Sequence, residues 1–80
     1  MALVTSIYSR PQEQTGRHPT EVECGYLVVQ SSEGPILQLT TFGSSTRAMP
    51  GKASQTMQFD RQSATQLRQI IDQVFPSADL

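Results

Sequence analysis

The clearest periodic pattern lies near the end of the chain, in "DRQSATQLRQIIDQVFP". Its apolar residues recur three or four positions apart, which is the spacing of one face of an α-helix; they are Ala64, Leu67, Ile70, Ile71, Val74 and Phe75. Asp60 is suited to cap the first turn, because its carboxylate can accept hydrogen bonds from the free amides there. Pro76 cannot continue a helix. The pattern predicts an amphipathic helix over about residues 61–75, with its apolar stripe in the core.

A second pattern predicts a β-hairpin. The stretches "EVECGYLVVQ" (21–30) and "PILQLTTF" (35–42) are rich in β-branched and aromatic residues and are separated by a short polar connector. Alternate side chains of the first strand point to opposite faces, and both faces are apolar: Tyr26 and Val28 on one, Leu27 and Val29 on the other. Such a strand is either central in its sheet or covered by a partner chain.

A third strand is expected over "SQTMQF" (54–59), directly before the helix. Here, and in the strand 35–42, apolar and polar residues alternate: Leu37, Leu39, Met57 and Phe59 against Gln38, Thr40, Thr56 and Gln58. Alternation of this kind is typical of a sheet with one wet face. With "ALVTSIY" (2–8) as a further short strand, the chain is expected to form an α+β fold: an antiparallel sheet of about four strands packed against one C-terminal helix.

The length of 80 residues indicates a single domain. A chain of this size buries only roughly 60% of its unfolded surface, so its core is thin and pairing with a second copy would stabilise it. The stretch "SRPQEQTGRHPTE" (9–21) combines two prolines, a glycine and polar residues, and we expect it to be flexible. The sheet and helix then occupy residues 22–75.

Positive charge is concentrated in the second half of the chain, although the net charge is −1. Residues 1–34 carry two arginines against four glutamates, whereas residues 35–71 carry four basic side chains against one aspartate. Arg47 and Lys52 lie in "GSSTRAMPGKA" (43–53), which has too many glycines and prolines for regular structure and is expected to be an exposed loop. Both side chains are suited to contacting phosphates. The spacing does not match a P-loop.

Catalytic chemistry has little support in the sequence. Cys24 is the single cysteine and His18 the single histidine; the first falls in a predicted strand and the second in the predicted flexible stretch. One cysteine excludes an intramolecular disulfide and a cysteine-based zinc site, which suits a reducing compartment. We therefore expect no enzyme, no metal and no cofactor. No apolar run is long enough to span a membrane, so we expect a cytoplasmic protein without a membrane partner.

The order of these elements resembles the single-stranded-DNA-binding domain of the positive-cofactor-four type of transcriptional coactivator and its small bacterial relatives. The resemblance covers residues 26–75 and is carried by "ILQLTTFGSSTRAMPGKASQTMQFDRQSATQLRQII". It implies a curved antiparallel sheet, a homodimer formed through helices and sheet, and a groove for single-stranded nucleic acid. The residues that it implies for this groove are Arg47 and Lys52 of the basic loop, with Thr40, Phe42, Thr56 and Gln58 on the strands.

Two hypotheses follow for the function. The first is a homodimeric, non-catalytic binder of single-stranded nucleic acid, DNA in preference to RNA, acting in transcription or genome maintenance; Phe42, Tyr26 and Tyr8 are its candidate stacking residues, since Phe59 and Phe75 are expected in the core. The second is a protein–protein interaction module or regulatory subunit that uses its sheet face, a strand edge or the helix.

Overall fold

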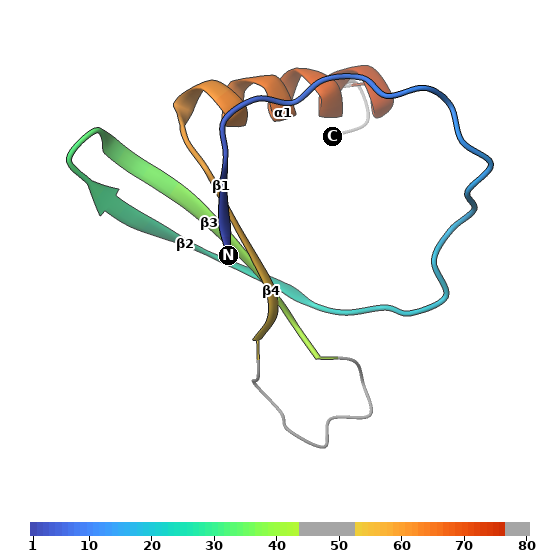
Figure 1. Cartoon of the computed structure of the whole chain (residues 1–80), viewed down its shortest axis with the longest axis horizontal. Helices are drawn as coiled ribbons and strands as arrows, with labels where there is room; N and C mark the ends of the chain where they lie inside the picture. Colours follow the sequence, from blue (N-terminus) through green and yellow to red (C-terminus); the bar gives the residue numbers. More distant parts are fainter. Residues whose placement is uncertain (44–52, 77–80) are drawn as a thin grey trace.

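The computed structural model of the chain describes residues 1–43 and 53–76. It contains four strands and one helix (Figure 1), in the order β1 (Ala2–Val4), β2 (Cys24–Ser31), β3 (Gly34–Phe42), β4 (Ala53–Phe59) and α1 (Arg61–Val74). The predicted α+β fold, a sheet packed with one C-terminal helix, is confirmed. The two predicted loop cations, Arg47 and Lys52, lie outside the described residues.

The sheet has the strand order β1-β4-β3-β2. β2, β3 and β4 are antiparallel neighbours, whereas β1 pairs with β4 in parallel, with Ala2 opposite Met57 and Val4 opposite Phe59. The sheet is therefore mixed, where the sequence predicted antiparallel pairing throughout. The parallel pair is possible because residues 5–23 carry the chain from β1 across to the opposite edge of the sheet, where β2 begins.

The predicted hairpin is confirmed, with its strands shifted toward the turn. Only Ser32 and Glu33 separate β2 from β3. Gly34 follows them with φ of 110°, a left-handed conformation that glycine adopts without steric cost. Ser31 closes the turn, because its hydroxyl donates to the Gly34 carbonyl (2.7 Å) and accepts from the Glu33 N–H (3.2 Å).

Asp60 caps α1, as the sequence predicts. The Ser63 N–H donates to Asp60 Oδ1 (2.9 Å), and the Asp60 N–H donates to Ser63 Oγ (3.1 Å), so two amides at the start of the helix are satisfied reciprocally. The hydrogen bonds from Ser63 favour the charged carboxylate and hold the pKa of Asp60 below its ordinary value. The helix begins at Arg61, as predicted, and ends at Val74, one residue before the predicted end.

The Ser63 hydroxyl should contribute measurably to stability, because Ser63 is fully buried and is the acceptor for the Asp60 N–H. Ser63→Ala leaves that amide without its partner, and we expect it to lower the free energy of unfolding by about 1–2 kcal/mol. Urea denaturation followed by far-ultraviolet circular dichroism measures the loss. Thr65→Ala is the matched control, since Thr65 is exposed and its hydroxyl only donates to the Arg61 carbonyl of its own helix. Equal losses in both variants would contradict this role.

The core of the single chain is small. Among the described residues, Phe59 is the one apolar side chain that is fully buried, at 6% exposure, and it lies between the sheet and the first turns of α1. The predicted apolar stripe of the helix is buried only in part: Ala64, Leu67 and Ile70 are partly exposed, and Phe75 is 60% exposed. The expectation that Phe75 lies in the core is wrong for the isolated chain. Figure 1 shows the reason, because the later turns of α1 extend past the strands.

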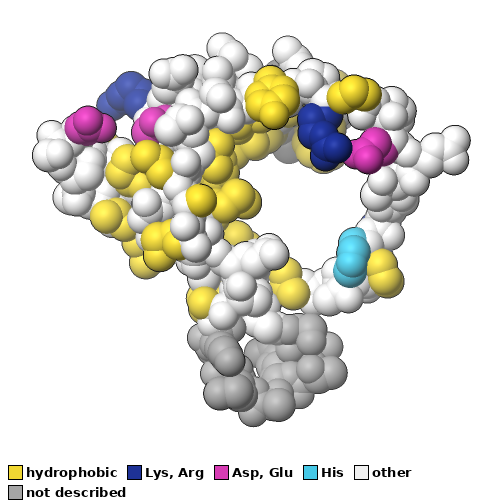
Figure 2. All heavy atoms as spheres, viewed as in Figure 1, with side chains coloured by type: hydrophobic (Ala, Val, Ile, Leu, Met, Phe, Trp, Pro, Cys, Tyr) yellow, Lys and Arg dark blue, Asp and Glu magenta, His cyan; other side chains and the backbone are white. Residues whose placement is uncertain are grey.

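Residues 5–23 form a long connection without helix or strand. It is anchored near its start, where the Ile7 N–H donates to Gln66 Oε1 of α1 (2.8 Å), and Ile7 is its only residue that is not exposed. Beyond that point its side chains pair locally, Arg10 with Glu13 (3.0 Å) and Arg17 with Glu21. Figure 2 shows an opening between this segment and the body of the molecule. The flexibility of residues 9–21 stays a prediction.

Candidate nucleic-acid interface

The two faces of the sheet differ in chemistry. Side chains alternate along each strand, so Leu37 and Phe59, which line a pocket against α1, point away from the face that carries Gln38 and Gln58. We call the face toward α1 the helix-side face and the opposite one the polar face. The polar face of β3 and β4 carries Gln38, Thr40, Phe42, Thr56 and Gln58. The predicted wet face is therefore formed by the residues that the alternation indicated.

The centre of the polar face is a ladder of cross-strand hydrogen bonds. Gln58 Nε2 donates to Gln38 Oε1 (2.9 Å), and the hydroxyls of Thr40 and Thr56 lie 3.4 Å apart. Each pair sits at directly opposed positions of β3 and β4. All four side chains are partly exposed, and an amide or hydroxyl that makes one such bond keeps further donor and acceptor positions for a ligand.

Phe42 extends this surface toward β2. A bulge follows Thr41 at the end of β3, and the Phe42 N–H donates to the Glu23 carbonyl (3.1 Å), which holds the strand end in place. The ring lies over Gly25, because a Cβ atom added there would lie only 3.3 Å from Phe42 Cε2. A glycine at this position lets the aromatic ring come close to the backbone of β2. The ring is partly exposed and stands at the end of β3 from which residues 44–52 continue.

The structure brings together four of the six residues predicted for the interface: Thr40, Phe42, Thr56 and Gln58. Arg47 and Lys52 lie outside the described residues, so their approach to this surface stays a prediction. The prediction did not include Gln38 and Gly25. Gln38 was detectable, because it stands two positions before Thr40 in the alternating strand, whereas no sequence pattern links Gly25 to Phe42.

The other two candidate stacking residues do not lie on the polar face. Tyr26 is opposite Leu39, which is opposite Met57, so it belongs to the helix-side face, where it is 76% exposed. Tyr8 is exposed in the segment 5–23. Phe42 is therefore the aromatic residue that the fold combines with the polar ladder.

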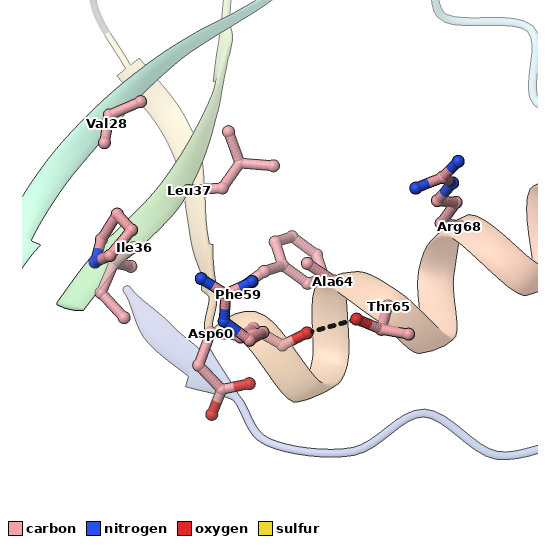
Figure 3. A pocket seen from close by; sticks show the side chains of 10 residues that line it. Val28, Ile36, Leu37, Phe59, Asp60, Ala64, Thr65 and Arg68 are labelled. Atoms are coloured by element: carbon pink, nitrogen blue, oxygen red, sulfur yellow. Dashed lines mark hydrogen bonds between the residues drawn. The ribbon is translucent and has the colours of Figure 1, made fainter. Parts of the chain in front are cut away.

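A pocket of about 330 Å³ opens on the helix-side face, between α1 and the ends of β2 and β3 (Figure 3). Its wall is apolar and is formed by Val28, Ile36, Leu37, Phe59 and Ala64, with Pro35 beside them. Arg61, Arg68, Asp60 and Thr65 complete the lining. The small side chain of Ala64 leaves this space open over the sheet. The apolar wall is suited to holding an apolar group.

The described residues provide no metal site, since no three His, Cys, Asp or Glu side chains gather in a suitable cluster. Cys24 is exposed on β2, and His18 lies in the segment 5–23, where its Nδ1 accepts from the Thr20 N–H (3.0 Å). In the part of the chain that the structure describes, no helix is long and apolar enough to cross a membrane.

Comparison of the chain with models of known protein families, with curated protein sequences and with solved structures found no match.

Proposed function

We propose that this protein is a non-catalytic, homodimeric binder of single-stranded nucleic acid, with DNA preferred, that acts in transcription or genome maintenance. The observation that carries the proposal is the polar face. There the fold places Phe42 beside the ladder of Thr40 and Thr56, at the strand end that leads into the sequence of Arg47 and Lys52. Stacking on an aromatic ring, hydrogen bonds from amides and hydroxyls, and neutralisation of phosphates are the interactions that single strands require.

The exposed surface supports a second copy. The chain exposes 7030 Å², whereas a compact folded chain of its mass, 8.8 kDa, exposes roughly 4,800 Å². Its radius of gyration is 14.9 Å, against about 11.6 Å for a compact domain of 80 residues. A standard interface covers roughly 800 Å² of each partner, which is well within this excess. Two copies also bring two polar faces and four loop cations to one ligand.

The binding of a labelled oligothymidine, followed by fluorescence anisotropy at low and moderate salt with a matched duplex as control, tests the proposal. We expect preference for the single strand and affinity that falls steeply as salt rises, because cations released from the strand drive the association. No binding at low salt would contradict the proposal.

The double variant Arg47→Ala with Lys52→Ala is expected to abolish this binding while the far-ultraviolet circular dichroism spectrum stays unchanged. Each phosphate contact contributes about 0.7 to the slope of log affinity against log salt for a single strand, so the two side chains should account for about 1.4 per chain of the slope measured for the unaltered protein. The matched control is Arg10→Ala with Arg17→Ala, which removes two cations from the segment 5–23. If the control variant loses as much affinity, the effect is one of total charge, and the assignment of the loop is wrong.

A protein–protein interaction module is the second candidate function. It is favoured by exposed large apolar side chains, because Tyr26 and Val28 on the helix-side face of the sheet are 76% and 57% exposed and Val74 at the end of α1 is 61% exposed. Two results would favour this function: a specific protein partner whose binding tolerates salt, and no affinity of the chain for the oligothymidine.

A further inference from the structure

β2 is an open edge of the sheet. Among the described residues, the strand order leaves β3 as the one neighbour of β2, which excludes the first of the two explanations for its apolar faces, a central position. The remaining explanation is cover by a partner chain. Natural edge strands are usually shortened, charged or interrupted by proline, because an open edge recruits other strands. The opposite edge, β1, is three residues long, but β2 runs for eight residues, CGYLVVQS, without a charge or a proline.

The open backbone groups of β2 can be assigned by residue. In an antiparallel pair, hydrogen-bonded and non-hydrogen-bonded positions alternate. The Phe42 N–H donates to the Glu23 carbonyl, so the odd-numbered residues of β2 turn their amide groups toward β3. The N–H and C=O groups of the even-numbered residues point outward, away from the sheet; these residues are Cys24, Tyr26, Val28 and Gln30.

The side chains at the middle of β2 are exposed on both faces. Tyr26 and Val28, on the helix-side face, are 76% and 57% exposed, and Leu27, on the polar face, is 50% exposed. Leaving three consecutive large apolar side chains this open at a strand edge is unfavourable for a single chain in water. The open backbone and the open side chains therefore coincide at the same residues.

We propose that β2 pairs antiparallel with β2 of a second copy, about a two-fold axis that passes at Leu27; the proposal rests on the homodimer proposed above. In this register Leu27 lies opposite its own copy, Tyr26 opposite Val28, and Cys24 opposite Gln30. The register is selected by the backbone, because it is centred on the four outward-facing residues and pairs all of them, whereas a shift along the strand leaves some unpaired. It also opposes an aromatic and a β-branched side chain, which is a favourable cross-strand pair.

The pairing would join the two sheets into one of eight strands with β2 and its copy at the centre. The polar faces of both copies then lie on the same side of this sheet, related by the two-fold axis, with Phe42 and Gly25 of each copy near the junction. A single strand of nucleic acid would meet one continuous surface instead of two separate ones. The second copy thus completes the proposed binding face.

Disulfide trapping tests the register. Leu27→Cys with Cys24→Ser places two cysteines at a non-hydrogen-bonded pair, whose Cα atoms lie about 4.5 Å apart and can form a disulfide. We expect an intermolecular cross-link under mild oxidation. The unaltered chain and Gln30→Cys with Cys24→Ser are the controls, since their equivalent cysteines would be six residues out of register, roughly 20 Å apart, and should not cross-link. Gln30→Cys alone should cross-link through Cys24. Cross-linking of the controls as efficiently as Leu27→Cys would overturn the register.

A charge exchange at the same position tests the interface independently of cysteine chemistry. Leu27→Lys and Leu27→Glu each oppose like charges across the axis, and we expect each variant to dimerise at least tenfold more weakly, measured by sedimentation equilibrium. An equimolar mixture should recover the dimer as a heterodimer, which also shows that both variants fold. If either variant dimerises as tightly as the unaltered chain, this interface is wrong and the homodimer must form elsewhere.

The outcomes separate this proposal from the proposed function. An unaltered chain that is monomeric at tens of micromolar overturns both the edge pairing and the homodimer. A dimer that cross-links at position 27 but does not bind the oligothymidine supports the edge pairing and contradicts nucleic-acid binding. A dimer that binds the oligothymidine and does not cross-link at position 27 supports nucleic-acid binding and contradicts the edge pairing.

Discussion

Replacing Phe59 with alanine is expected to destabilise the chain strongly and to move its urea midpoint far below that of the unaltered chain. Phe59 is the one fully buried apolar side chain of the described residues, and removing a buried phenylalanine ring costs about 3–5 kcal/mol. A domain of 80 residues has a total stability of roughly 4–12 kcal/mol, so this single change removes a large part of it. Far-ultraviolet circular dichroism during urea denaturation measures both the midpoint and the residual structure.

Met57→Ala is the matched control for this experiment. Met57 lies two positions earlier on the same strand and the same face, but it is exposed. We expect it to shift the free energy of unfolding by less than about 1 kcal/mol, because an exposed site leaves no cavity. If both variants lose the same stability, the contact of Phe59 with α1 is not the centre of the core.

Replacing Phe42 with alanine is expected to weaken binding of the oligothymidine by roughly 5- to 150-fold, which corresponds to the 1–3 kcal/mol that a base gains by stacking on an aromatic ring. The salt dependence should stay the same, because the variant removes no charge. Fluorescence anisotropy at several salt concentrations gives both quantities.

Met57→Ala also controls the test of Phe42, since Met57 lies on the helix-side face, opposite to the polar ladder. Its affinity for the oligothymidine should be unchanged. Equal affinity of Phe42→Ala and the unaltered chain would remove the polar face from the proposed interface. A weaker Met57→Ala variant would instead point to the helix-side face.

Local patterns were sufficient for the elements that depend on neighbouring residues. The spacing of apolar residues predicted α1, and Asp60 was identified as its cap from its place before the first turn. The alternation in β3 and β4 placed Thr40, Thr56 and Gln58 on one face before their pairing was known. These predictions succeeded because helix and strand periods are properties of the local backbone.

The same patterns failed where the outcome depends on distant segments. The exposure of Phe75 was not predicted. An apolar stripe shows which face of the helix tends to be buried, but it does not show how far the sheet extends beneath that face. The parallel pairing of β1 with β4 was not predicted either, since three residues such as Ala2–Val4 carry too little pattern to select a partner. The contact of Phe42 with Gly25 depends on the register of two strands.

The sequence by itself determined the α+β class, the positions of the hairpin and the helix, the cap at Asp60, and the polar character of one sheet face. Only the tertiary structure decided that β2 lies at an edge, that Phe59 alone among the described apolar residues is fully buried, and that Phe42 joins the polar ladder. The physical reason is how far apart along the sequence the interacting residues lie. Periodicity and capping are set by residues a few positions apart, whereas strand order and burial are set by which distant segments exclude water from one another.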